Sequence, residues 1–141
     1  MNVQTAFQEY AKFLENLTVE GVPGLSAYVS DDVLFSDPFH EVKGALKMAQ
    51  IFVQMFEKVS DVTFKINDSA ASGNMVYFNW VLNGKLSTKI WIIEGVTQLR
   101  FNEDLKIESH KEYWDAASQF YERFPIFGPV LRYFRHRIAS P

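Results

Sequence analysis

The chain has 141 residues, a formal net charge of −3 and no cysteine. This length fits a single domain, residues 1–141, around one core. Basic residues are sparse before the last ten positions, which argues against a nucleic-acid partner. The lack of cysteine excludes a disulfide framework and a thiolate nucleophile. Because no apolar run reaches the roughly 20 residues that span a bilayer, we expect no membrane partner and a soluble, unprocessed, cytoplasmic protein.

The first third of the chain is predicted to be mostly helical. Apolar residues recur at helical spacing over about 3–18, and the stripe includes the phenol of Tyr10. A cluster of glycine and proline at 21–24 ends this helix, and Leu25, Tyr28 and Val29 predict a short second helix with Pro23 near its start. A third helix at 44–58 has one narrow polar strip, so we expect it to be buried on most sides across a curved sheet.

Between the second and third helices, a short apolar run delivers Asp37 directly in front of Pro38. Proline fixes its own φ and pushes the preceding residue toward extended geometry, so the carboxylate is held at a strand end. Covered by an apolar cup, Asp37 would be a desolvated general base. Without such a cup it would be an ordinary turn former, and both interpretations stay open at this point.

The second half of the chain alternates with period two, which predicts four antiparallel strands with one wet face. They span residues 62–67, 76–83, 88–101 and 107–114. Gly95 is predicted to mark a bulge that curves the sheet. We place Tyr77, Val81 and Trp91 on the wet face, which is apolar enough to predict a symmetric homodimer. Strands that follow helices in this way predict an α+β fold.

After the last strand, Asp115 is predicted to cap a helix over 116–124. Pro125 and Gly128 interrupt it, and an apolar stripe backed by three arginines and a histidine then predicts a helical tail. We expect the tail to pack on its own domain or on a second copy. An anionic lipid surface is the weaker alternative, because three arginines are few.

The side chains that remain favour acid–base chemistry without a metal or cofactor. The histidines at 40, 110 and 136 show no metal-binding spacing, and no phosphate loop, nucleophile elbow or dinucleotide fingerprint is present. Alternation on the last strand puts His110, Glu112 and Trp114 on one face, which indicates a pocket wall. A solvent-exposed face, or a buried His110 with a structural hydrogen bond only, are the alternatives.

The succession of motifs resembles a known family over essentially the whole chain. Two N-terminal helices, a strand ending in Phe-x-Asp-Pro-Phe, a glycine opening an apolar helix, and strands closing with His-x-x-Tyr-Trp-Asp resemble the SnoaL-like branch of the nuclear transport factor two-like superfamily. The resemblance implies a cone-shaped α+β barrel: a curved, mostly antiparallel sheet wrapped around N-terminal helices, with a C-terminal helical tail. The superfamily also includes ketosteroid isomerases, polyketide cyclases and limonene epoxide hydrolases, so its fold does not fix its function.

Carried over onto this chain, the resemblance implies that Asp37 is the general base and Tyr10 the oxyanion donor of a ketosteroid isomerase-like proton transfer. Thr97 stands where that family has a protonated aspartic acid, which is a stronger hydrogen-bond donor. Independently of the resemblance, a neutral His110 across the pocket would accept or return the proton. The residues expected to contact an apolar ligand are Phe35, Phe39, Phe78, Trp80, Thr97, Glu112 and Trp114.

The first functional hypothesis is a cofactor-free isomerase or cyclase that acts by proton transfer on a small, flat, apolar carbonyl compound, steroid- or polyketide-like. The alternative is a noncatalytic domain that binds a small hydrophobic ligand on the same fold. Epoxide hydrolysis ranks third, because it needs an arginine and two carboxylates around one water, and Arg100 alternates to the face opposite Thr97. A pure dimerisation scaffold is the last option.

Overall fold

The computed structural model describes residues 1–121, 125 and 127–139. At its centre lies one curved sheet of six strands in the order β2-β1-β6-β5-β4-β3. The strands are β1 (Val29–Ser36), β2 (Glu41–Lys43), β3 (Val59–Ser72), β4 (Met75–Leu86), β5 (Lys89–Phe101) and β6 (Ile107–Trp114). Strands β1 and β6 pair in parallel, and the other neighbours are antiparallel. Among the described residues β2 and β3 do not pair, so the sheet stays unclosed.

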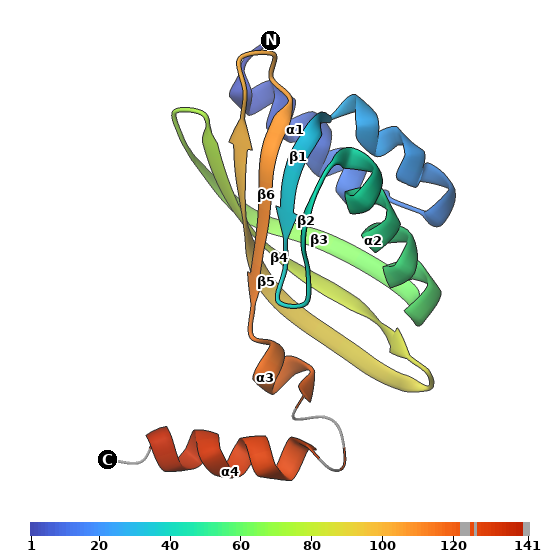
Figure 1. Ribbon diagram of the computed structural model, residues 1–141, viewed down its shortest axis with the longest axis vertical. Helices are drawn as coiled ribbons and strands as arrows, with labels where there is room; N and C mark the ends of the chain where they lie inside the picture. Colours follow the sequence, from blue (N-terminus) through green and yellow to red (C-terminus); the bar gives the residue numbers. More distant parts are fainter. Residues whose placement is uncertain (122–124, 126, 140–141) are drawn as a thin grey trace.

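Three helical segments precede or interrupt the strands of the sheet. They are α1 (Val3–Glu15), the 3-10 helix η1 (Val19–Ala27) and α2 (Ala45–Lys58). Figure 1 shows α1 and α2 on the same side of the sheet, which curves around them. Two more helices follow β6: α3 (Ala116–Gln119) continues from the end of that strand, and α4 (Phe127–Ala139) lies apart from the sheet (Figure 1).

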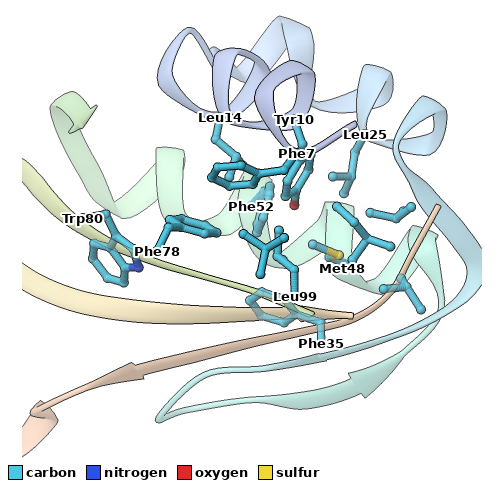
Figure 2. Packing of buried hydrophobic residues seen from close by; sticks show 14 of the residues in the cluster. Phe7, Tyr10, Leu14, Leu25, Phe35, Met48, Phe52, Phe78, Trp80 and Leu99 are labelled. Atoms are coloured by element: carbon cyan, nitrogen blue, oxygen red, sulfur yellow. The ribbon is translucent and has the colours of Figure 1, made fainter. Parts of the chain in front are cut away.

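The hydrophobic core fills the space between these helices and the inner face of the sheet. Figure 2 shows side chains from both layers pointing toward one another: Phe7, Tyr10, Leu14, Leu25, Phe35, Met48, Phe52, Phe78, Trp80 and Leu99. The alternation of β4 explains its share of this core, since Val76, Phe78 and Trp80 are buried while Tyr77 and Asn79 face outward. The same helical period that predicts the stripe of α1 brings its apolar face onto the sheet.

Local sequence explains where the helices begin. Oδ1 of Asn2 accepts the N–H of Thr5 at 2.9 Å and so caps α1. Gly44 precedes α2 with a φ of 112°. Residues with a Cβ rarely adopt this backbone conformation, so a glycine is required there. Asp115 caps α3 as predicted, and its hydrogen bonds with Ser118 lower the pKa of its carboxyl.

The predicted α+β architecture, with a curved and mostly antiparallel sheet around N-terminal helices, is confirmed. The second helix, however, forms at Val19–Ala27, so it begins before Pro23 and ends before Val29, which is buried as the first residue of β1. Besides the four strands that alternation predicts, the sheet contains β1, which is the strand predicted in front of Asp37, and the short strand β2, which the sequence does not predict. Strand β1 pairs with both β2 and β6.

Two predictions about β5 are wrong. Trp91 does not lie on the wet face: it is 7% exposed and shares the inward side with Thr97, whereas Ile92 is 43% exposed. Because side chains alternate along a strand, the buried position of Thr97 fixes Trp91 on the same face. Gly95 does not mark a bulge, since β5 and β4 pair in continuous register through Gly95 and Trp80.

Helix α2 is less buried than its composition predicts. Its fully buried residues are Met48 and Phe52, and Leu46 is 82% exposed. The reason is geometric: α2 lies across one face of the sheet, so the side of the helix away from the sheet meets solvent in spite of its apolar residues.

The C-terminal segment also differs from its prediction. Helix α3 ends at Gln119, and residues 122–124 of the predicted helix lie outside the described residues. On α4, Val130, Phe134 and Ile138 are all more than half exposed while Leu131 is partly buried, so these three residues of the predicted stripe do not pack on the domain. Packing on a second copy stays a prediction. None of the described helices is long and apolar enough to cross a membrane.

Candidate functional site

A cavity of about 410 Å³ lies between the inner face of the sheet and the helices α1 and α2. All the ligand-contacting residues expected from the sequence line it: Phe35, Phe39, Phe78, Trp80, Thr97, Glu112 and Trp114. Asp37 and His110 line the same cavity, whereas Tyr10 is not among its lining residues. The sequence-predicted residues are thus gathered around one hollow, with Tyr10 behind its wall.

Asp37 directly follows β1 and holds a tight turn together. Its Oδ1 accepts the backbone N–H groups of Phe39 at 2.8 Å and of His40 at 2.7 Å. The carboxylate also contacts the ring of His40, with Nδ1 lying 2.9 Å from Oδ1 and 3.1 Å from Oδ2. The Asp37 side chain is 12% exposed. Asp37 therefore has the features of both interpretations, because it holds a turn together and also lines the cavity.

Three polar side chains form a chain of contacts that runs from the cavity wall into the core. The hydroxyl of Tyr10 lies 3.0 Å from Nδ1 of His110, and Nε2 of His110 lies 3.0 Å from Oε1 of Glu112. An ionised carboxylate can only accept, so Nε2 of His110 carries the proton and the Tyr10 hydroxyl donates to Nδ1. His110 is therefore both buried, at 1% exposed, and part of the wall.

Burial controls the protonation of Tyr10. Desolvation, and then the negative charge of Glu112, raise the pKa of the Tyr10 phenol well above its ordinary value. The phenol therefore stays neutral at physiological pH and keeps the proton that it donates to His110. Its role as an oxyanion donor stays a prediction, because in this structure its hydroxyl contacts the imidazole.

The parallel pairing of β1 and β6 brings two carboxylates to one end of the cavity. Phe35 pairs with His110 in the register of these strands, and Asp37 and Glu112 follow two positions later on the same face. Each acid contacts its own imidazole, Asp37 that of His40 and Glu112 that of His110. Within the described residues, no three acidic, histidine or cysteine side chains form a group that could hold a metal ion.

Thr97 places a hydroxyl on the cavity wall. The indole Nε1–H of Trp80 donates to Oγ1 of Thr97 at 2.8 Å, so the threonine oxygen is an acceptor toward the core. Both residues are buried and line the cavity. A hydroxyl has one donor and two acceptor sites, and no hydrogen bond donated by Thr97 is found among the described residues.

Aromatic rings close the cavity at the end nearest α3. The ring centroid of Phe39 lies 5.3 Å from that of Trp114 and 5.0 Å from that of Phe120. The indole of Trp91 also faces Phe120, and its Nε1–H donates to the carbonyl oxygen of Gln119 at 2.7 Å. This hydrogen bond holds the short helix α3 against the sheet, and Phe120 and Tyr121, which follow α3, line the cavity.

Two residues of the site escape the sequence reasoning. In the sequence analysis His40 is only one of three histidines without metal-binding spacing. Its position one turn after Asp37 is the pattern that would have indicated its contact with the carboxylate. Trp91 is assigned to the wrong face, although its parity with Thr97 gives the right one. His40 adds an imidazole to the polar end of the cavity, and Trp91 adds a large apolar ring.

A comparison with protein-family models identifies the fold family. The model described as a SnoaL-like domain matches residues 10–110. The chain belongs to the SnoaL-like family. The match of this SnoaL-like domain runs from Tyr10 in α1 to His110 in β6, so it includes Asp37 and Thr97, whereas Glu112, Trp114 and Phe120 of the cavity wall lie beyond its end. A search of curated proteins found no match.

Solved structures similar to this SnoaL-like domain carry different functions in their descriptions. One is a nuclear transport factor 2-like protein of unknown function from Burkholderia pseudomallei, with 13% identity, a TM-score of 0.72, and coverage of 83% of this chain and 93% of that chain. Another is an epoxide hydrolase from Mycobacterium tuberculosis, with 17% identity, a TM-score of 0.68, and coverage of 97% and 95%.

A third similar structure is a hypothetical protein with a ketosteroid isomerase-like fold from Catenulispora acidiphila, in complex with trimethylamine. It is 16% identical, has a TM-score of 0.67, and the match covers 84% of this chain and 88% of that chain. At such identities these likenesses show the fold of the SnoaL-like domain alone.

Proposed function

We propose that this SnoaL-like domain is a cofactor-free isomerase or cyclase that moves a proton on a small, apolar carbonyl compound. One observation carries the proposal: two carboxylate–imidazole pairs, Asp37 with His40 and Glu112 with His110, open into one cavity whose remaining wall is mostly apolar. Acid–base groups in a water-poor hollow suit proton transfer next to a carbonyl.

In this proposal Asp37 supplies the base. Its turn fixes the carboxylate, since two backbone N–H groups hold Oδ1 in place. A base held in position in this way needs no reorganisation when the substrate arrives, and general base catalysis contributes about 100- to 10,000-fold.

The pair of Glu112 and His110 returns the proton. Glu112 lines the cavity and its Oε1 contacts Nε2 of His110. A proton received by this pair is shared between a carboxylate and an imidazole that both line the cavity. The neutral Tyr10 phenol on the far nitrogen holds the ring in one tautomer.

Two hydroxyls serve the oxygen of the developing enolate in this proposal. Thr97 offers a donor directly at the cavity wall, because Trp80 already satisfies one of its acceptor sites. Tyr10, the oxyanion donor implied by the family, acts through His110 unless its side chain turns toward the substrate. Preorganised donors aimed at such an oxygen commonly make the largest contribution to a rate of this kind.

A noncatalytic binding domain is the second candidate, and the turn at Asp37 favours it. Three hydrogen-bond contacts on Oδ1 are what a structural carboxylate makes, and they occupy the acceptor sites that a base would need. A cavity of about 410 Å³ is within the range that holds a drug-sized ligand. In this alternative the domain binds an apolar ligand but does not catalyse a reaction.

The experiment compares the wild type with Asp37→Asn and with Asp32→Asn, an exposed acid on β1, the strand that Asp37 follows. Each protein is incubated with a panel of enones in deuterated water, and deuterium incorporation at the carbons next to the carbonyl is followed by mass spectrometry. We expect exchange by the wild type and Asp32→Asn, and a loss of about 100-fold or more in Asp37→Asn.

Tryptophan fluorescence separates the two candidates in the same samples. All three tryptophans of the chain, Trp80, Trp91 and Trp114, line the cavity, so a bound enone changes their emission. Binding without exchange favours the noncatalytic domain. Equal exchange by the wild type and Asp37→Asn contradicts the role of Asp37.

A further inference from the structure

His40 and Asp37 are joined more closely than a turn requires. Beyond the backbone contacts of the turn, Nδ1 of His40 lies within hydrogen-bond distance of both carboxylate oxygens. The ring of Phe39 meets the imidazole edge-on, with centroids 6.3 Å apart. The imidazole is therefore held from two sides while 36% of its side chain stays exposed and part of it lines the cavity.

The carboxylate decides which nitrogen of His40 carries the proton. An ionised carboxylate accepts hydrogen bonds only, so Nδ1 of His40 must be the N–H when the ring is neutral. Nε2 is then the nitrogen with the free lone pair. No hydrogen bond to Nε2 of His40 is found among the described residues, so this lone pair is open to a ligand.

The two groups of the turn differ in how free they are to accept a further proton. Oδ1 of Asp37 already receives three contacts, and Oδ2 receives one from the ring of His40. Nε2 of His40 has no such competitor. An acid that orients the ring of a neutral histidine is also the arrangement in which imidazole acts as a general base.

We propose that His40 is a catalytic residue of the site: its Nε2 accepts the proton from the substrate carbon, and Asp37 positions the ring and stabilises the imidazolium that forms. This inference rests on the proposed function and refines it, because it makes the base a pair of residues and not a lone carboxylate. In the step, the carbon–hydrogen bond breaks, the proton forms a bond with Nε2, and the electron pair moves to the carbonyl oxygen as an enolate.

A generic proton-transfer probe tests the step without knowledge of the natural substrate. With 5-nitrobenzisoxazole, the base removes the proton from C3, the electrons of that bond form the third carbon–nitrogen bond, and the nitrogen–oxygen bond breaks to release a coloured nitrophenolate. The proteins to compare are the wild type, His40→Gln, His40→Ala, Asp37→Asn and His136→Ala, the last being an exposed histidine on α4.

We expect both His40 variants to lose about 100-fold or more in rate, as does Asp37→Asn, while His136→Ala keeps the wild-type rate. Glutamine can still donate to Asp37 and preserve the turn, so its loss would not be one of folding. Added imidazole should restore part of the rate of His40→Ala, which a structural role would not produce. If both His40 variants keep the wild-type rate while Asp37→Asn loses it, this inference is wrong and the proposed function stands.

A tautomer measurement decides the inference even if the wild type does not turn over this probe, an outcome that counts against the proposed function. Long-range proton–nitrogen correlation spectra distinguish the two neutral forms of histidine, and the signals missing from His40→Gln assign residue 40. We expect the Nδ1–H form in the wild type and a shift toward the Nε2–H form in Asp37→Asn. The Nε2–H form in the wild type would overturn the proposal, because Nε2 then has no lone pair to accept a proton.

Discussion

Trp80 and Gly95 are register partners on β4 and β5, and the indole ring occupies the space above the glycine. A Cβ at position 95 would lie 2.5 Å from Cζ2 of Trp80. The bare backbone at Gly95 therefore lets the indole lie close against the sheet, where its Nε1–H reaches Thr97. The glycine serves packing and not curvature.

The variant Gly95→Ala tests this relationship. We expect it to lower the free energy of unfolding by about 1–3 kcal/mol, because the added methyl displaces a buried ring. Urea denaturation measures the change. Gly21→Ala is the control, since a Cβ there lies 3.4 Å from Oγ1 of Thr18, its nearest neighbour, and should change stability by less than about 0.5 kcal/mol. An equal effect of the two substitutions would show that the overlap at Gly95 is relieved without cost.

Thr97 gives a second prediction, on activity. Thr97→Val keeps the shape of the side chain and removes the hydroxyl, so exchange of a turned-over enone should fall by about 100-fold if this donor meets the enolate oxygen. Thr97→Ser keeps the hydroxyl and should stay close to the wild type. Deuterium incorporation measures both. If valine and serine behave alike, Thr97 is a wall residue and not a donor.

The buried phenol of Tyr10 predicts how stability responds to alkaline pH. Its folded pKa is raised, while an unfolded tyrosine titrates near about 10, so its contribution to stability is complete below about pH 10 and is lost as the pH rises through the folded value. The wild type should therefore lose up to about 1.4 kcal/mol more per pH unit above about 10 than Tyr10→Phe. Urea denaturation at a series of alkaline pH values measures the difference, and parallel curves would contradict it.

At neutral pH the same variant has a separate cost. Tyr10→Phe leaves Nδ1 of His110 without its hydrogen bond in a fully buried position, which should lower stability by about 1–3 kcal/mol. This loss is independent of the alkaline effect. The difference in stability at neutral pH measures the lost hydrogen bond, and the difference in slope at alkaline pH measures the titration of the phenol.

The outer face of the sheet predicts self-association. Although Trp91 lies on the inner face of the sheet, the outer face still exposes a group of large apolar side chains: Tyr77, Ile92, Val96 and Tyr113. Val96 and Tyr113 are register partners on β5 and β6, so the group is continuous across these strands. Such a face is the kind of surface that a second copy covers in a symmetric dimer, and we expect a dimer by sedimentation at micromolar concentration.

A charge at the centre of this face tests the dimer. Val96→Glu places two like charges near each other across a two-fold interface, so it should give a monomer of unchanged fold. Leu46→Glu is the control, because Leu46 is exposed on α2, away from the sheet. A wild-type monomer, or a dimer that survives Val96→Glu, would contradict the predicted surface.

The predictable part of the fold follows from local periodicity. The alternation of residues 76–83 and the helical stripe of α1 depend on neighbours in the sequence, and the structure confirms both. The parallel partnership of β1 and β6 depends on contacts between distant segments, which no local pattern contains. For that reason the sequence predicts the strand before Asp37 but not its place beside β6, and it misses the short strand β2.

The same distinction applies to the site. Asp37 is recognisable because Pro38 and the strand before it mark its position locally. The approach of His40 to the carboxylate depends on the hydrogen bonds of the turn, and the contact of Tyr10 with His110 depends on how α1 crosses β6. A sequence can supply such residues as candidates, but only the folded chain pairs them.

The β1–β6 pairing also has a consequence for how the protein matures. One carboxylate comes early in the chain and its counterpart in the last strand, and joining segments so far apart is the slow, entropically costly kind of contact. A nascent chain that has left the ribosome only as far as β5 lacks the wall that holds Glu112. The proposed site is therefore complete only once β6 has paired with β1.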